Sequence, residues 1–86
     1  MEIKMKEVLL CSTLNKESSK FIIKGLENRG ISYLQRWEEI SVFKRKKYNN
    51  EKEICRIFIN TGQKQEAMQY LESLSEEETI NIIVEK

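Results

Sequence analysis

Two apolar runs, one on each side of a strongly basic segment, constrain the fold of this chain more than any other feature. Residues 31–37 and 53–60 are rich in β-branched and aromatic side chains, which favour extended strands. Residues 44–52, between them, combine a cluster of lysine and arginine with two consecutive asparagines, a composition typical of a turn. The centre of the sequence therefore predicts one long hairpin with a basic tip, formed by Lys44, Arg45, Lys46 and Lys47.

The apolar pattern of the first strand changes phase after Trp37. Ile31, Tyr33 and Trp37 share one face of an extended strand, because successive side chains point to opposite sides. Ile40 has the other parity. The change predicts a β-bulge or a short break at residues 38–39. The second strand has a clearly apolar inner face of three alternate residues, Cys55, Ile57 and Ile59.

The N-terminal third of the chain predicts a strand and then a helix. Residues 6–11 form a short apolar run that predicts a buried strand, followed by a turn at residues 12–15. Residues 16–28 carry apolar side chains at helical spacing, with Thr13 or Asn15 as the N-cap and Gly30 as the stop. We expect Gly25, within this helix, to lie close against the sheet.

The C-terminal third predicts a second helix and a last strand. An apolar stripe of Ala67, Tyr70 and Leu71 indicates a helix over residues 63–74. After an acidic turn, residues 79–84 alternate between apolar and polar side chains, which predicts a strand.

These elements follow the order β-α-β-β-α-β. We expect one α+β domain over residues 1–86 with a ferredoxin-like arrangement, in which a four-stranded antiparallel sheet carries both helices on one face. The other face of the sheet stays partly apolar through Phe58, through Leu34 or Trp37, and through Phe43 if the strand extends that far. A second subunit usually covers such a face in so small a domain, so we expect a homo-oligomer, either a dimer or a trimer.

Composition argues against several functional classes. The sequence has no histidine, and neither its cysteines nor its carboxylates follow the spacing of a zinc or calcium site. We therefore expect no enzymatic activity, no catalytic residue, no metal site and no cofactor. A formal charge of +1 and the absence of a long apolar run or signal-peptide pattern favour a cytoplasmic protein without membrane attachment.

Cys11 and Cys55 both lie in apolar runs. In a cytoplasmic chain such cysteines are more often small buried hydrophobic residues than disulfide partners, so we expect two buried free thiols.

The basic tip is the one local departure from electrical neutrality. Together with neighbouring aromatic and basic residues it forms the candidate ligand- or partner-binding set, Arg36, Trp37, Lys44, Arg45, Lys46, Lys47 and Tyr48. Such a set can neutralise phosphates while a ring stacks on a base. Alternatively, lysines on an exposed edge only prevent unwanted strand pairing. The acidic residues 72–78 can complement the tip from a neighbouring subunit, although a solvated helix end explains them equally well.

A family resemblance adds to this interpretation. The triplet Arg36-Trp37-Glu38, and the run from Ile57 to Thr61 that leads into residues 63–67, resemble the divalent-cation-tolerance CutA proteins and, more distantly, the nitrogen-regulatory PII proteins. The resemblance covers about the second half of the chain. It implies trimers of ferredoxin-like subunits, in which residues 36–56 carry ligands or contact partners. It does not extend to the metal-binding or glycine-rich phosphate-binding segments of those families.

Two functional hypotheses follow. The first is a non-enzymatic regulatory or interaction module of the PII, CutA or ACT kind, which binds a partner protein or a small anionic effector at a subunit interface or at the hairpin. The second is a nucleic-acid-binding domain that uses the basic hairpin together with the aromatic side chains Trp37, Tyr33 and Phe58.

Overall fold

A computed structural model describes residues 6–48 and 50–84 of the chain. Its elements follow the order β-α-β-β-α-β, with two short 3-10 helices inserted. They are β1 (Glu7–Thr13), α1 (Lys16–Asn28), β2 (Tyr33–Glu39), η1 (Arg45–Tyr48), β3 (Glu53–Asn60), η2 (Thr61–Gln63), α2 (Lys64–Glu72) and β4 (Ile82–Ile83).

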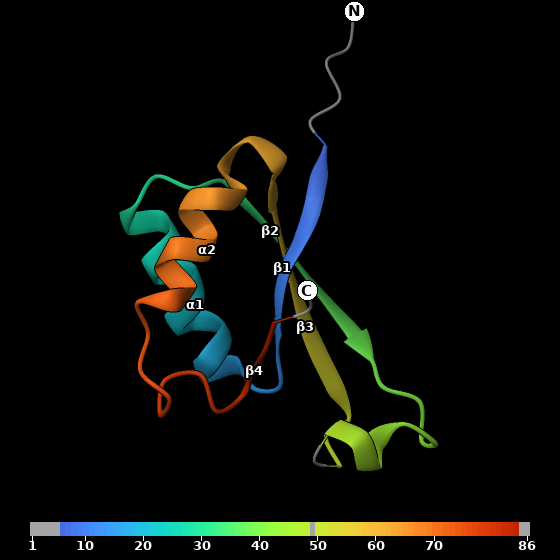
Figure 1. Cartoon of the computed structure of the whole chain (residues 1–86). Coiled ribbons are helices and arrows are strands. Elements are labelled where there is room, and N and C mark those ends of the chain that lie inside the picture. Colours follow the sequence, from blue (N-terminus) through green and yellow to red (C-terminus); the bar gives the residue numbers. More distant parts are fainter. Residues whose placement is uncertain (1–5, 49, 85–86) are drawn as a thin grey trace, which may run out of the picture.

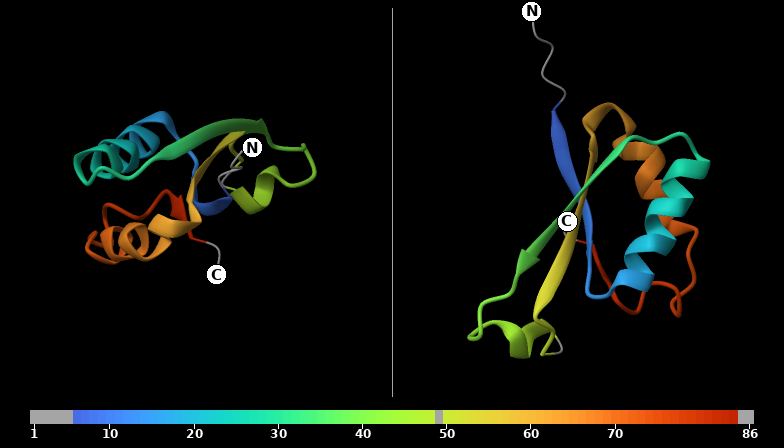
Figure 2. Two further views of the ribbon diagram at one scale, coloured as in Figure 1. Left: turned by 90° about the horizontal axis from the view of Figure 1, so that it is seen from above. Right: turned by 180° about the vertical axis from the view of Figure 1, so that it is seen from behind.

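The four strands form one antiparallel sheet in the order β2-β3-β1-β4. In Figure 1 and in both views of Figure 2, α1 and α2 lie side by side on one side of this sheet, and the loop between β2 and β3 lies away from them. The α+β class and the four-stranded antiparallel sheet predicted from the sequence are therefore confirmed.

The ends of α1 are those that the sequence predicts. The Asn15 side chain accepts a hydrogen bond of 2.7 Å from the backbone N–H of Ser18, so Asn15 and not Thr13 is the N-cap. At the other end Gly30 has a φ of +68°, a conformation that glycine adopts without steric cost. The N–H of Ile31 then donates to the carbonyl of Leu26 at 2.9 Å and ends the helix.

The prediction of a β-bulge or a short break at residues 38–39 is wrong. β2 pairs with β3 residue for residue as far as Glu39, and the N–H of Ile40 continues the ladder by donating to the carbonyl of Lys52 at 2.8 Å. The apolar pattern changes phase because Ile40 packs on the opposite face of the sheet from Trp37. The irregularity lies in β1 instead, between Leu9 and Cys11.

The first and last strands differ in length from the prediction. β1 continues through Ser12 and Thr13, which the sequence assigned to a turn, because both pair with β3. β4 contains only Ile82 and Ile83, whereas residues 76–81 form a turn.

Reciprocal hydrogen bonds explain why residues 75–79 turn and do not extend. The backbone N–H of Ser75 donates to the Glu78 carboxylate, and the N–H of Glu78 donates to the Ser75 hydroxyl. This is a capping box, which favours helical geometry at residues 75–79. The side chain of Ile80 remains 78% exposed after that turn, although the alternation predicted a strand there.

We expected Gly25 to lie close against the sheet, but its nearest neighbour is a side chain of α2. It faces Tyr70 of α2, whose ring occupies the space that a Cβ at Gly25 would need. The glycine thus permits close approach of the two helices.

The main core lies between the sheet and the helices. It includes the predicted inner face of β3, with Ile22 and Leu26 of α1 and Leu71 of α2 against it. A second, smaller cluster lies on the opposite face, where Leu14, Ile40 and Ile54 are buried and Tyr48 and Ile83 pack against them. The hairpin loop therefore folds back and covers one end of the face that was expected to be open.

Candidate functional site

The basic tip is a short 3-10 helix and not the end of a strand. The Arg45 Nε donates to the carbonyl of Ile40 at 3.2 Å, which ties the loop to the end of β2. The Lys47 ammonium lies 5.9 Å from the centre of the Tyr48 ring. Tyr48 is half-buried against the second core cluster, so its ring stabilises the loop. Lys44 and Lys46 are exposed.

Arg36 and Trp37 point to opposite faces of β2. The Arg36 guanidinium lies 5.3 Å from the centre of the Phe58 ring, on the face away from the helices. Trp37 is opposite Cys55, on the helix face. The structure thus separates the residues that the sequence grouped as one candidate set, and the rings of Trp37 and Phe58 do not form a common stacking surface.

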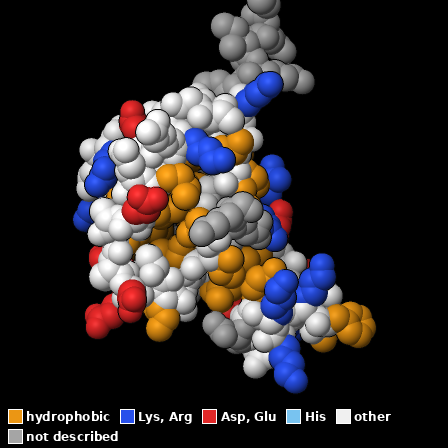
Figure 3. Space-filling model, in the orientation of Figure 1, with side chains coloured by type: hydrophobic (Ala, Val, Ile, Leu, Met, Phe, Trp, Pro, Cys, Tyr) orange, Lys and Arg blue, Asp and Glu red, His pale blue; other side chains and the backbone are white. Residues whose placement is uncertain are grey.

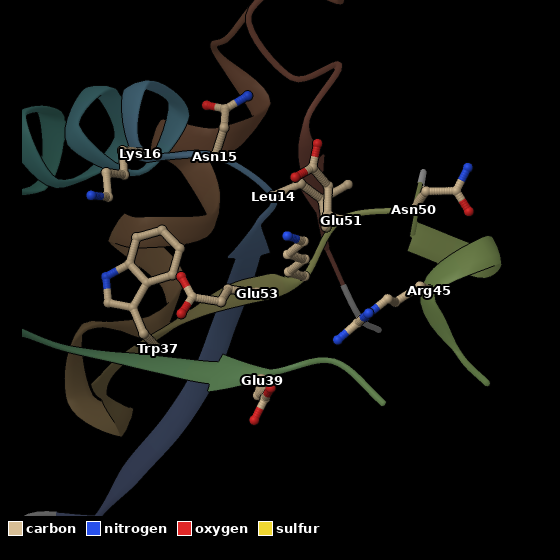
Figure 4. A pocket seen from close by; sticks show the side chains of 10 residues that line it. Leu14, Asn15, Lys16, Trp37, Glu39, Arg45, Asn50, Glu51 and Glu53 are labelled. Carbon is tan, nitrogen blue, oxygen red and sulfur yellow. The ribbon is translucent and has the colours of Figure 1, made fainter. Parts of the chain in front are cut away.

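Trp37 lines a cavity of about 520 Å³ at the end of the sheet where β1 and β2 end and β3 begins. The start of α1, the end of β2 and the second half of the hairpin loop surround it, as Figure 4 shows. We call it the hairpin-base pocket. Asn15, the N-cap of α1, also lines it, so the positive end of the helix dipole lies at its edge.

Charged side chains of both signs line the hairpin-base pocket. Three are cationic and three are carboxylates: Lys16, Arg45 and Lys52, and Glu39, Glu51 and Glu53. Within the part of the chain that the structure describes, no ion pair joins any two of these six. Apart from the Arg45 Nε, which donates to the Ile40 carbonyl, their charged groups can contact a molecule that enters the pocket.

Of the residues that line this pocket, only Trp37 and Arg45 were candidate site residues from the sequence. Lys16 and Asn15 lie more than twenty positions away from Trp37 in sequence, and they reach the pocket only because α1 begins where β2 ends. The alternation of charge at residues 51–53 is the one local signal that could have indicated the site.

The two thiols are buried and free, as predicted. Burial, with a smaller contribution from Cys55, raises the pKa of Cys11 to about 12. The Ser19 hydroxyl lies 3.1 Å from the sulfur of Cys55 and also receives a hydrogen bond of 3.4 Å from Gln35. These neutral contacts give neither thiol an activating base.

Neither a metal-binding cluster nor a membrane-spanning helix is present in residues 6–48 and 50–84. No group of three or more cysteine or carboxylate side chains there is arranged to hold a metal ion. No helix in that part of the chain is long and apolar enough to cross a bilayer.

Comparison with protein-family models, with curated proteins and with solved structures finds no match to this chain. The resemblance to the CutA and PII proteins therefore stays a prediction from the sequence.

Proposed function

We propose that this chain is a non-enzymatic regulatory or interaction module of ferredoxin-like topology, which binds a small effector and acts in the cytoplasm as a homo-oligomer. The observation that supports the proposal is the hairpin-base pocket, which three cationic side chains, three carboxylates and a tryptophan line together. The strand order β2-β3-β1-β4, with antiparallel neighbours and both helices on one side, supports the topology.

The lining of the pocket favours an effector that carries both signs of charge over the purely anionic one expected from the basic tip. A carboxylate or phosphate group fits beside Lys16 and the N-terminus of α1, because both present positive charge. An ammonium group fits near Glu51 and Glu53. The Trp37 indole offers an aromatic surface for the apolar part of the same molecule or for its cation.

Nucleic-acid binding is the alternative function. The exposed lysines of the basic tip favour it, since they can contact phosphates. The positions of the aromatic rings favour it less. Trp37 and Tyr33 share the helix face of β2, Phe58 lies on the opposite face beneath Arg36, and Tyr48 packs in the second core cluster.

Intrinsic fluorescence tests effector binding directly, because Trp37 is the only tryptophan in the sequence and lines the pocket. We would titrate the protein with the twenty free amino acids, with inorganic phosphate and with a single-stranded RNA oligonucleotide. The proposal predicts a saturable change in emission with at least one of the zwitterions, and little change with inorganic phosphate.

Matched variants assign the response to the pocket. Glu53→Gln and Lys16→Gln each remove one lining charge and should weaken the response, whereas Lys64→Gln, an exposed lysine on α2, should not. A response to RNA alone, falling steeply as salt is added, would favour the nucleic-acid function instead.

A further inference from the structure

The most exposed large apolar side chains of the described residues lie in two places. Phe43 is 96% exposed and Val42 is 69% exposed, side by side in the hairpin loop. Ile80, 78% exposed, lies in the turn before β4. Large apolar side chains are normally buried, because removing their surface from water is favourable. None of the three contributes to either core cluster.

The charges around these two places have opposite signs. Val42 and Phe43, which we call the plug, are followed directly by the basic tip. Ile80 and the half-exposed Phe21 line a cavity of about 210 Å³ between α1 and the turn, which we call the socket. The charged residues that line the socket are all carboxylates, Glu17, Glu77 and Glu78.

The plug of one molecule cannot enter its own socket. Figures 1 and 2 place the hairpin loop beyond one side of the sheet and the turn before β4 on the helix side. In Figure 3 blue side chains surround an apolar group on the hairpin loop, while red side chains gather at the opposite lower corner of the molecule. Any contact between plug and socket must therefore join two molecules.

We propose that copies of this chain associate head to tail, with Val42 and Phe43 of one copy inserted into the socket between Phe21 and Ile80 of the next. The side chains of Lys44, Lys46 and Lys47 then face the carboxylates Glu17 and Glu77. Because each copy gives its plug to one neighbour and its socket to another, the contact is heterologous and builds a closed ring or an open chain. The inference names the surface of the homo-oligomer proposed above and rests on it.

Complementary variants test the contact by sedimentation velocity. Phe43→Ser damages the plug, and Ile80→Ser combined with Glu77→Lys damages the socket. Both change exposed residues outside the two core clusters, and circular dichroism checks that they fold. The native chain should form a species larger than a dimer. Each variant alone should sediment as a monomer.

A mixture of the two variants distinguishes plug-to-socket contact from contact between two plugs or between two sockets. One intact plug and one intact socket remain in the mixture, so it should form a 1:1 dimer and nothing larger. The Debye length falls to about 3 Å at 1 M salt, so this dimer should also dissociate as sodium chloride is raised. A mixture that stays monomeric, or variants that associate as the native chain does, would overturn the proposal.

Charge reversal provides an independent check. Lys46→Glu with Lys47→Glu should dissociate the oligomer, and adding Glu17→Lys and Glu77→Lys to the same chain should restore it.

A native chain that is monomeric at every concentration and binds phosphatidylserine vesicles only while Phe43 is present would also overturn the proposal, because the plug would then serve a membrane. Effector binding is read separately from Trp37, so failure of this contact is distinguishable from failure of the proposed effector site.

Discussion

The Tyr70 hydroxyl of α2 reaches across α1 at Gly25 and donates a hydrogen bond of 3.3 Å to the backbone carbonyl of Phe21. The guanidinium of Arg29, the C-cap residue of α1, lies 5.0 Å from the centre of the same ring. Burial raises the pKa of Tyr70, which keeps the hydroxyl protonated as a donor. The tyrosine fixes the distance between the two helices, and glycine is the residue that leaves room for it.

Gly25→Ala should therefore destabilise the protein even though alanine favours helices. The new Cβ would overlap the Tyr70 ring, and overpacking of this kind costs about 1–3 kcal/mol. Urea unfolding followed by circular dichroism measures the loss. Gly62→Ala is the control, because a Cβ there meets only the Asn60 side chain at 3.5 Å, an ordinary contact. Equal stability of the Gly25→Ala and native proteins would show that the helices lie farther apart.

Ile57→Asp should abolish folding. Ile57 is completely buried at the centre of β3, opposite Cys11 on one side and Gln35 on the other. An unpaired carboxylate at that position cannot be solvated. Leu34→Asp, on the edge strand and 42% exposed, should fold. A cooperative thermal transition in the Ile57→Asp protein would contradict the assignment of β3 to the core.

Both thiols should be unreactive in the folded protein at pH 8. Cys11 and Cys55 are fully buried, and burial raises the pKa of Cys11 to about 12, so the nucleophilic thiolate is scarce. Ellman's reagent should detect almost no thiol in buffer and both thiols in guanidinium chloride. Rapid labelling of the native protein would mean that β1 or β3 is open to solvent.

The turn before β4 should loosen in acid. Hydrogen bonds from the Ser75 backbone and hydroxyl lower the pKa of Glu78 below its ordinary value of about 4.5. A lowered folded-state pKa means that the stabilisation is complete above the ordinary value and is lost as pH falls through the lowered one. The Ser75 amide resonance should report this titration by NMR. Glu78→Gln should remove the pH dependence, whereas Glu76→Gln should leave it unchanged.

Arg45 should differ from the lysines that flank it. Its bond to the Ile40 carbonyl ties the loop, so Arg45→Ser should cost about 0.5–1.5 kcal/mol of stability. Lys44→Ser and Lys46→Ser should leave stability unchanged, because both side chains are exposed. Urea unfolding of the three single variants provides the comparison, and an equal effect at all three positions would contradict a structural role for Arg45.

Apolar spacing and capping residues correctly predicted the elements that bury a single face along their whole length. α1 and β3 have the bounds that apolar spacing and capping indicated, because each buries one continuous face. The phase change at Ile40 was misread because a strand that contributes to two cores looks the same in sequence as a strand with a bulge. The acidic turn before the last strand was predicted, but its extension through residues 79–81 was missed because the alternating apolar pattern of residues 79–84 indicated a strand there.

The candidate site was less predictable than the fold. Charge density indicated the basic tip, but not that Arg45 and Tyr48 would stabilise the loop. The hairpin-base pocket collects residues from α1, β2 and the hairpin loop, and no spacing rule links such distant positions. Only the relative placement of strand ends, which is a tertiary property, brings Lys16 near Trp37.

The most direct test of the interaction-module account is the solution mass of protein purified at low salt, measured by light scattering with and without ribonuclease. We expect a homo-oligomer whose mass ribonuclease does not change. A monomer that carries nucleic acid until it is digested would contradict the account and assign the basic tip to nucleic-acid binding.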